Sequence, residues 1–336
     1  MRVVNLLRKP NRAAVLLLTL LLCAGSGCAP TCDVAGAGSG VPVGHQDNSG
    51  GSRGGFKFLF AAATDGTGRQ GAIFRSTDSG KTWQSVAGTP PPTLTCFAAN
   101  DTYVFAPTVQ GLLRSADDGV TWSNTALLSG NEVLGVTAVG GYVIAATDYG
   151  IWRSTNNGDS WTRVYDPGYG NFATNGRDIL ASNPGLGVIY SRDTGRTWTE
   201  VASTIQTREV NGVVFDSIYM YAGTYQYGIY RSSNRGSTWQ QMPLTSYPYF
   251  YGLATMGDTL FAASDRGLLR STDFGYFWTP LGFNNSYTQS VLAISRPYIF
   301  VGTFGYGVSM TSDQGKTWST LDTGLTYNVV YGLGMK

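Results

Sequence analysis

Short apolar runs separated by turn residues dominate the chain between Phe56 and Lys336. One stretch, residues 132–165, shows the pattern as EVLGVTAVG, GYVIAAT, GIWRSTNNG and SWTRVY. Four runs rich in Val, Ile, Tyr and Trp, with Gly, Asn or Asp between them, predict four short strands joined by turns. Adjacent apolar residues in the third run, such as Ile151 and Trp152, predict a strand that is buried on both faces.

A ten-residue segment between the third and fourth predicted strands recurs along the chain and ends each time in tryptophan. FRSTDSGKTW, LRSADDGVTW and WRSTNNGDSW are three of the copies. The tryptophans are Trp83, Trp122, Trp161, Trp198, Trp239, Trp278 and Trp318. Their spacings are 39, 39, 37, 41, 39 and 40 residues. A repeated four-stranded unit of this length predicts the blades of a β-propeller.

The two ends of the repeat region predict how the ring closes. The region begins at FKFLFAAAT, which matches second strands such as GYVIAAT, and ends with NVVYGLGMK, which matches first strands such as YFYGLATMG. We therefore expect the last segment to supply the inner strand of the first blade, which leaves no free sheet edge between them. The predicted fold is all-β: a seven-bladed propeller of four-stranded blades over residues 56–336.

The repeated segment has the consensus Ser-x-Asp-x-Gly-x-Thr-Trp and lies where a hairpin turn is expected. Its third position holds Asp78, Asp117, Asn156, Asp193, Asn234, Asp273 and Asp313. Asp and Asn accept hydrogen bonds from nearby backbone N–H groups, and Gly supplies positive φ without steric cost. A residue needed once for chemistry would not occur seven times, so these positions are predicted to be structural.

On this motif the region 56–336 resembles the Asp-box, or BNR-repeat, propellers. That family includes sialidases, xyloglucanase-type endoglucanases, sortilin-like receptors and photosystem II assembly propellers. The resemblance implies that the Asp box is a structural turn on the blade periphery, away from the ligand site. The chain departs from the enzymatic members in two ways. No motif identifies the three arginines that a sialidase needs, and xyloglucanase-type enzymes usually have two propellers, whereas one is predicted here.

The first 27 residues are typical of an export signal. A basic stretch, MRVVNLLRKPNR, precedes the apolar run AAVLLLTLLL and small residues that lead to Cys28. Small residues before this cysteine resemble a lipoprotein signal, although Gly25 stands where Leu is usual. Two alternatives stay open: lipidation of Cys28, or cleavage nearby and release. Residues 28–55 are rich in Gly and Ser and predict a flexible tether.

Composition excludes several classes of function. The chain's only histidine, His45, lies in the tether, which argues against a Ser-His-Asp triad or a histidine metal site. Without the basic residues of the signal, acidic residues slightly outnumber basic ones, so nucleic acid is not expected as a partner. We expect no cofactor, no metal, contact with a membrane only through an N-terminal lipid, and a monomer outside the cytoplasm.

The loops opposite the Asp boxes differ between blades and are the expected place for function. Tyrosines gather there, and they offer flat amphipathic surface suited to a peptide or a sugar ring. The candidate ligand-binding residues are Tyr149, Tyr169, Tyr225, Tyr227, Tyr249, Tyr287 and Tyr306. The leading interpretation is a non-catalytic binding or assembly module for a protein or glycan. An alternative role for the same tyrosines is packing between loops.

A glycoside hydrolase is the alternative function. Hydrolysis of glycosides requires two carboxyl groups across the substrate. Glu132 and Glu209 occupy the same place in the third and fifth units, relative to the following Gly135 and Gly212. They are the best catalytic pair that the sequence offers, although two solvated loop acids would show the same pattern.

Overall fold

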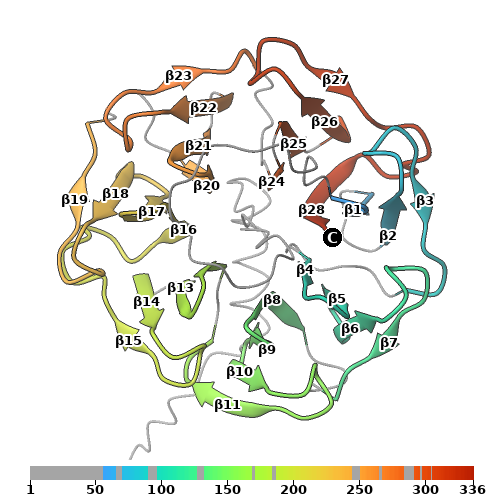
Figure 1. Cartoon of the computed structure of the whole chain (residues 1–336), viewed down its shortest axis with the longest axis horizontal. Coiled ribbons are helices and arrows are strands. Elements are labelled where there is room, and N and C mark those ends of the chain that lie inside the picture. Colours follow the sequence, from blue (N-terminus) through green and yellow to red (C-terminus); the bar gives the residue numbers. More distant parts are fainter. Residues whose placement is uncertain are drawn as a thin grey trace, which may run out of the picture.

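The computed structural model shows seven four-stranded antiparallel sheets arranged as blades around a central axis (Figure 1). It describes residues 56–65, 70–89, 97–126, 132–168, 171–183, 187–243, 250–264, 267–283, 291–295, 297–303 and 305–336. The predicted all-β propeller of seven four-stranded blades is confirmed. Cys28 and the predicted signal and tether lie outside these residues, as do Tyr169, Tyr249 and Tyr287.

Each blade runs from an inner strand near the axis to an outer strand at the rim. Blade 1 contains β28 (Val329–Met335), β1 (Leu59–Thr64), β2 (Gly71–Ser76) and β3 (Gln84–Ser85). Blade 2 contains β4 (Ala98–Ala99), β5 (Val104–Thr108), β6 (Gly111–Ser115) and β7 (Ser123–Asn124). Blade 3 contains β8 (Val133–Val139), β9 (Tyr142–Thr147), β10 (Gly150–Ser154) and β11 (Thr162–Tyr165).

The remaining blades follow the same order from axis to rim. Blade 4 contains β12 (Phe172–Asn175), β13 (Asp178–Asn183), β14 (Gly187–Ser191) and β15 (Thr199–Glu200). Blade 5 contains β16 (Val210–Phe215), β17 (Met220–Thr224), β18 (Ile229–Ser232) and β19 (Gln240–Gln241). Blade 6 contains β20 (Phe250–Met256), β21 (Thr259–Ser264), β22 (Gly267–Ser271) and β23 (Thr279–Pro280). Blade 7 contains β24 (Val291–Ser295), β25 (Tyr298–Gly302), β26 (Val308–Thr311) and β27 (Ser319–Thr320).

The ring closes through β28, as the sequence predicts. β28 pairs antiparallel with β1 from Leu59 opposite Met335 to Thr64 opposite Val329. The amides of Lys57 and Phe58 donate hydrogen bonds of 2.7 and 2.9 Å to the carbonyl of Lys336. Segments from opposite ends of the propeller therefore form one sheet.

Apolar side chains of neighbouring blades pack against one another. This packing buries the second and third strands of each blade on both faces. Phe60 of β1 packs against Phe97 and Trp122 of blade 2, with ring centroids 5.5 and 6.2 Å apart. Trp83 is 4% exposed, and its indole Nε1 donates a hydrogen bond of 2.9 Å to the carbonyl of Leu321 in blade 7. A single blade exposes these side chains and gains its stability only between two others.

The Asp box closes the turn between the third and fourth strands by a fixed set of hydrogen bonds. In blade 2, Ser115 Oγ donates to Asp117 Oδ1 (2.8 Å) and accepts from the amide of Gly119 (2.8 Å). The amide of Thr121 donates to Asp117 Oδ1 (2.8 Å), and its hydroxyl donates to Oδ2 (2.6 Å). Where Asn replaces Asp, the side-chain amide donates instead, from Asn156 Nδ2 to Ser160 Oγ (3.0 Å).

The residue before the box glycine adopts positive φ, although it is never glycine. These residues are Ser79, Asp118, Asn157, Thr194, Arg235, Phe274 and Gln314, with φ between 55° and 62°. The left-handed conformation costs energy for residues other than glycine, so the surrounding hydrogen bonds must hold it. The sequence predicts positive φ for the box glycines, and Gly119, for example, has φ +85°. The positive φ of the preceding residue was not predicted.

Arginines on the third strands connect each blade to the next Asp box. Arg75 Nε donates a hydrogen bond of 2.6 Å to the carbonyl of Asp118, and Arg153 Nε donates one of 2.9 Å to that of Thr194. Both acceptors are positive-φ residues of the following blade. The Arg153 guanidinium also lies 3.9 Å from the ring centroid of Tyr142. A packing role, which the repetition of these arginines predicts, is consistent with this geometry.

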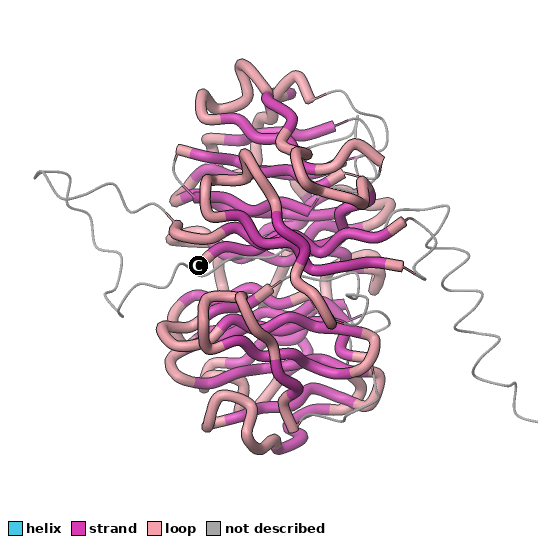
Figure 2. Tube along the Cα trace, turned by 90° about the vertical axis from the view of Figure 1, so that its right-hand side faces the viewer, coloured by secondary structure: helices cyan, strands magenta, loops and turns pink. Residues whose placement is uncertain are grey.

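Both ends of the described chain lie on the face that carries the Asp boxes, which we call the Asp-box face. Lys336 Nζ lies 2.9 Å from Oδ1 of Asp118, and Lys57 Nζ lies 3.8 Å from Oδ2 of the same residue. Figure 2 shows the ring edge-on, with the C-terminus on this side. The opposite side, which we call the loop face, carries the turns between second and third strands and the blade-to-blade loops.

Candidate functional site

In blades 2, 3, 5, 6 and 7, a threonine or serine hydroxyl holds the turn between the second and third strands on the loop face. Thr147 Oγ1 donates to the carbonyl of Gly150 (3.3 Å) and accepts from the amide of Tyr149 (3.1 Å). Thr224 Oγ1 does the same with Gly228 (2.8 Å) and Tyr227 (3.0 Å). These hydroxyls are buried, so the turn is fixed from within the blade.

In three of these turns, the exposed residues include a tyrosine directly before the glycine that begins or precedes the third strand. Tyr149 is 55% exposed, Tyr227 41% and Tyr306 53%. The Tyr306 amide is bound by Thr303 Oγ1 (3.1 Å), as in the other two turns. Three of the predicted tyrosines thus occupy equivalent positions in blades 3, 5 and 7, and the fold spaces them around the face.

Tyr225 lies two residues before Tyr227 in the same turn and is half-buried. Its amide donates a hydrogen bond of 3.2 Å to the carbonyl of Glu209, which connects the turn of blade 5 to the loop that enters that blade. Glu209 is exposed, and its own amide is held by Thr207 Oγ1 at 3.1 Å. The carboxylate of Glu209 therefore stands on an ordered backbone.

Glu132 is half-buried where the inner strand of blade 3 begins. Burial raises the pKa of Glu132 above its ordinary value, and the negative charge of Asp148 raises it further. Asp148 precedes Tyr149 in the turn of the same blade. The carboxylate that acts on Glu132 thus comes from a neighbouring loop of its own blade, while the pairing of Glu132 with Glu209 stays a prediction.

Side-chain amides link the inner strands of blades 4, 5 and 6 near the axis. Asn171 Nδ2 donates a hydrogen bond of 2.7 Å to the carbonyl of Asn211. Asn211 Nδ2 in turn donates one of 2.9 Å to the carbonyl of Phe250. The pairing of β16 with β17 shifts register between Val210 and Gly212, so Asn211 lies at a β-bulge. The sequence analysis did not identify this chain of amides, and only the repeat register of the two asparagines could have suggested it.

Acidic side chains prevail over basic ones on the described part of the loop face. The acidic residues in its turns and loops are Asp65, Glu132, Asp148, Asp166, Glu209 and Asp322. Asp166 is paired with Arg163 of β11 (Nη2 to Oδ2, 2.7 Å), and Arg208, the arginine in the described loops, lies 3.9 Å from Glu200 Oε2. Exposed tyrosines within a negative field favour a ligand that carries positive charge and apolar surface.

Within the described ranges, no group of three or more His, Cys, Asp or Glu side chains is placed to hold a metal ion. Those ranges also contain no helix that is long and apolar enough to cross a membrane.

No protein-family model and no curated protein match the sequence. Solved structures match its fold. The GH74 xyloglucanase from Xanthomonas campestris is 17% identical, with a TM-score of 0.62 over 81% of this chain and 54% of the enzyme. This chain thus spans about half of the enzyme's length.

Two structures of YCF48 match along most of their own length. YCF48 bound to D1 peptide is 18% identical, with a TM-score of 0.57 over 75% of this chain and 88% of that chain. YCF48 from Cyanidioschyzon merolae is 18% identical, with a TM-score of 0.55 over 76% and 95%. The chain is a seven-bladed β-propeller similar in structure to both groups. At these identities the likeness shows the fold, and the fold carries both a hydrolase and a peptide-binding protein.

Proposed function

We propose that this chain is an exported, non-catalytic binding module that holds a polypeptide on its loop face. The observation that carries the proposal is the equivalent, solvent-exposed placement of Tyr149, Tyr227 and Tyr306 on hydroxyl-bound turns. A tyrosine on a fixed turn loses little conformational entropy when it contacts a ligand. The YCF48 structure with a D1 peptide supports a polypeptide ligand for a propeller of this kind.

The acidic surroundings narrow the chemistry of that polypeptide. Asp148 adjoins Tyr149, and Glu209 shares a backbone hydrogen bond with Tyr225. A segment with lysine or arginine beside apolar residues would satisfy both the carboxylates and the tyrosine rings. A neutral glycan would use the rings alone.

The proposal includes export and a tether to the cell envelope through Cys28. Its support is the signal-like segment 1–27 and the position of Phe56 and Lys57, which lie beside Lys336 on the Asp-box face. The described chain therefore begins on the Asp-box face, opposite the proposed binding face. Labelling with a radioactive fatty acid tests the lipid: Cys28→Ser should abolish incorporation, and unchanged incorporation would remove this part of the proposal.

Glycoside hydrolysis is the second candidate, favoured by one observation. Burial and the charge of Asp148 raise the pKa of Glu132, and a carboxyl group of raised pKa that acts with a second carboxyl group is the pairing that glycosidases use. The GH74 enzyme has the same propeller architecture. Glu132→Gln should abolish any turnover and leave the fold intact.

One experiment separates the two functions. The purified protein is mixed with arrayed basic, acidic and neutral peptides and with polysaccharides and sialosides, and retained ligand and released sugar are measured together. We expect retention of basic peptides without release of sugar, weakened by Tyr149→Ala and weakened less by Glu132→Gln, which removes one carboxylate of the acidic face. Sugar release that disappears in Glu132→Gln would establish the hydrolase instead, and retention of glycans without release would replace the polypeptide by a glycan.

A further inference from the structure

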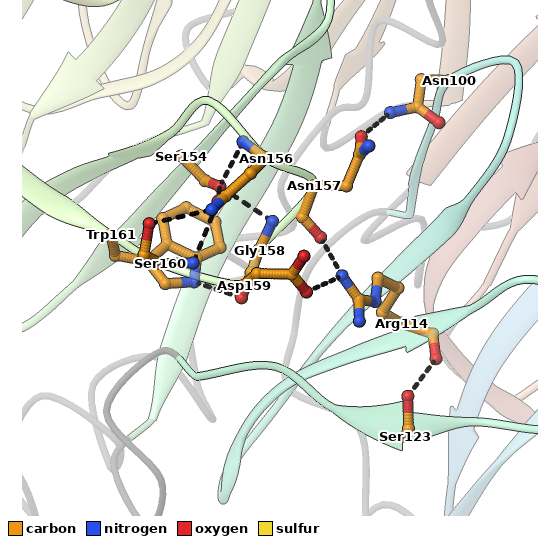
Figure 3. A network of polar contacts seen from close by, with 10 residues as sticks. All are labelled: Asn100, Arg114, Ser123, Ser154, Asn156, Asn157, Gly158, Asp159, Ser160 and Trp161. Carbon is orange, nitrogen blue, oxygen red and sulfur yellow. Dashed lines mark hydrogen bonds and ion pairs between the residues drawn. The ribbon is translucent and has the colours of Figure 1, made fainter.

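Where two blades meet, which we call a joint, the residue after the box glycine of one blade lies near the third-strand arginine of the preceding blade. The type of this residue differs between joints. Between blades 2 and 3 it is Asp159, whose Oδ1 lies 2.7 Å from Nη1 of Arg114 (Figure 3). Between blades 5 and 6 it is Tyr276, whose hydroxyl accepts a hydrogen bond of 2.9 Å from Nη2 of Arg231. In both joints the protein itself supplies an oxygen to the guanidinium.

The joint between blades 3 and 4 reverses this arrangement. The position after its box glycine is Arg196, which lines the same hollow as Arg153 of blade 3. Arg153 uses Nε and Nη2 on the carbonyl and hydroxyl oxygens of Thr194, at 2.9 and 3.3 Å, and stacks on Tyr142. Among the described residues, neither Arg153 nor Arg196 has a carboxylate as an ion-pair partner.

Arg153 and Arg196 line a hollow of about 210 Å³ between the outer part of blade 3 and the Asp box of blade 4. Its other lining residues are Thr155, Ser160, Thr162 and Val164. Ser160 belongs to the Asp box and Thr162 to β11, so hydroxyl donors stand on rigid elements beside the two cations. Two facing cations repel one another unless an anion lies between them.

We propose that this hollow binds a phosphate-type oxyanion, with Arg153 and Arg196 as the charged clamp. Guanidinium groups donate paired hydrogen bonds to the oxygens of phosphate, and threonine and serine hydroxyls complete such a shell. The oxyanion takes the place that the Asp159 carboxylate holds in the preceding joint. The phosphate can come from solution or from the head group of an anionic lipid.

The test follows the side-chain Nε–H signals of Arg153 and Arg196 by NMR while inorganic phosphate is added to the whole protein. We expect saturable shifts of both signals. Arg196→Asp places a carboxylate opposite Arg153, as in the preceding joint, and should weaken phosphate binding at least about tenfold. Arg192→Asp is the matched control, because it makes the same charge change in the same turn, outside the hollow. It should retain most of the affinity.

Flotation with phosphatidylcholine vesicles, with and without phosphatidylglycerol, distinguishes the two sources of phosphate. Binding to the anionic vesicles that is lost in Arg196→Asp and kept in Arg192→Asp assigns the site to a lipid head group. Arg196→Gln serves in both assays if the aspartate variant does not fold. The proposal is overturned if neither probe binds saturably, or if Arg192→Asp and Arg196→Asp weaken binding equally.

Discussion

Arg114 Nη1 donates a hydrogen bond of 2.6 Å to the backbone carbonyl of Asn157, a residue of the next blade that has φ +55° (Figure 3). The same nitrogen lies 2.7 Å from Asp159 Oδ1, and the guanidinium lies 4.8 Å from the ring centroid of Tyr103. The Arg114 side chain thus binds the positive-φ turn of blade 3, pairs with the Asp159 carboxylate in that turn, and packs on Tyr103 of blade 2. The joint between blades is polar at the rim and apolar inside.

Arg114→Ala should lower the free energy of unfolding by about 1–3 kcal/mol, because the variant loses a charge-assisted hydrogen bond and the stacking on Tyr103. The ion pair with Asp159 contributes little to this loss, since Asp159 is largely exposed. Urea unfolding followed by tryptophan fluorescence measures the change. Arg270→Ala is the control: its Nη1 bonds to the side chain of Gln314, so the loss should be smaller. Equal losses would contradict a role for the turn carbonyl.

Ser115→Ala should destabilise the protein by about 1–3 kcal/mol, since it leaves the buried amide of Gly119 without its acceptor. Asp117→Asn should be nearly neutral at pH 7, because Asn156 and Asn234 already make the same turn in blades 3 and 5. Urea unfolding of both variants measures the contrast. If Asp117→Asn costs as much as Ser115→Ala, the carboxylate charge matters more than its geometry.

Acid should weaken the Asp boxes that contain aspartate. Hydrogen bonds from the hydroxyl and amide of Thr121 lower the pKa of Asp117 from 3.8 to about 2. A carboxyl group whose pKa is lower in the folded state stabilises the fold above its unfolded pKa, and this stabilisation is lost as the pH falls through the folded value. Stability should therefore decline between about pH 4 and pH 2.

Asp117→Asn removes the contribution of that one box. Unfolding free energies at pH 7 and pH 3 should differ less in the variant than in the unchanged protein. An identical pH dependence in both proteins would show that Asp117 is not among the groups responsible for acid sensitivity.

Phe277→Thr should stabilise the protein. Phe277 stands where the other Asp boxes have threonine or serine, and 80% of its surface is exposed. Its amide donates to Asp273 Oδ1 at 2.9 Å and to Oδ2 at 3.2 Å, but it has no hydroxyl that could donate to Oδ2 as well. A threonine would supply that hydrogen bond, as Thr121 does for Asp117, and raise the unfolding free energy by about 0.5–1 kcal/mol. A lower thermal midpoint in the variant would show that the exposed ring contributes to folding.

The repeat made most of the fold predictable from sequence. Seven tryptophans at blade spacing determined the number of blades, and the match of NVVYGLGMK to first strands predicted the pairing of β28 with β1. The box aspartates were assigned to structural turns because the motif recurs seven times between the third and fourth predicted strands.

The details that depend on neighbouring blades were not predictable. Arg114 and Arg153 occupy the same position in the repeat. Their surroundings differ because Asp159 of the next blade pairs with Arg114, whereas Arg196 of the next blade lines a hollow with Arg153. The threonine that holds Tyr149 could have been found, because Thr or Ser precedes the glycine by three residues in TVQG, TDYG and SDRG. The influence of Asp148 on Glu132 depends on how two loops of blade 3 approach each other.

The proposal that the loop face is the binding face rests most directly on a comparison of two tyrosines. Tyr227 on the loop face is 41% exposed, and Tyr276 on the Asp-box face is 43% exposed. The affinity of the best-retained ligand is measured by isothermal titration calorimetry for Tyr227→Ala and Tyr276→Ala. We predict about tenfold weaker binding for Tyr227→Ala and no change for Tyr276→Ala, since a buried aromatic contact contributes about 1–2 kcal/mol. Loss of affinity in Tyr276→Ala alone would contradict the account and place the ligand on the Asp-box face.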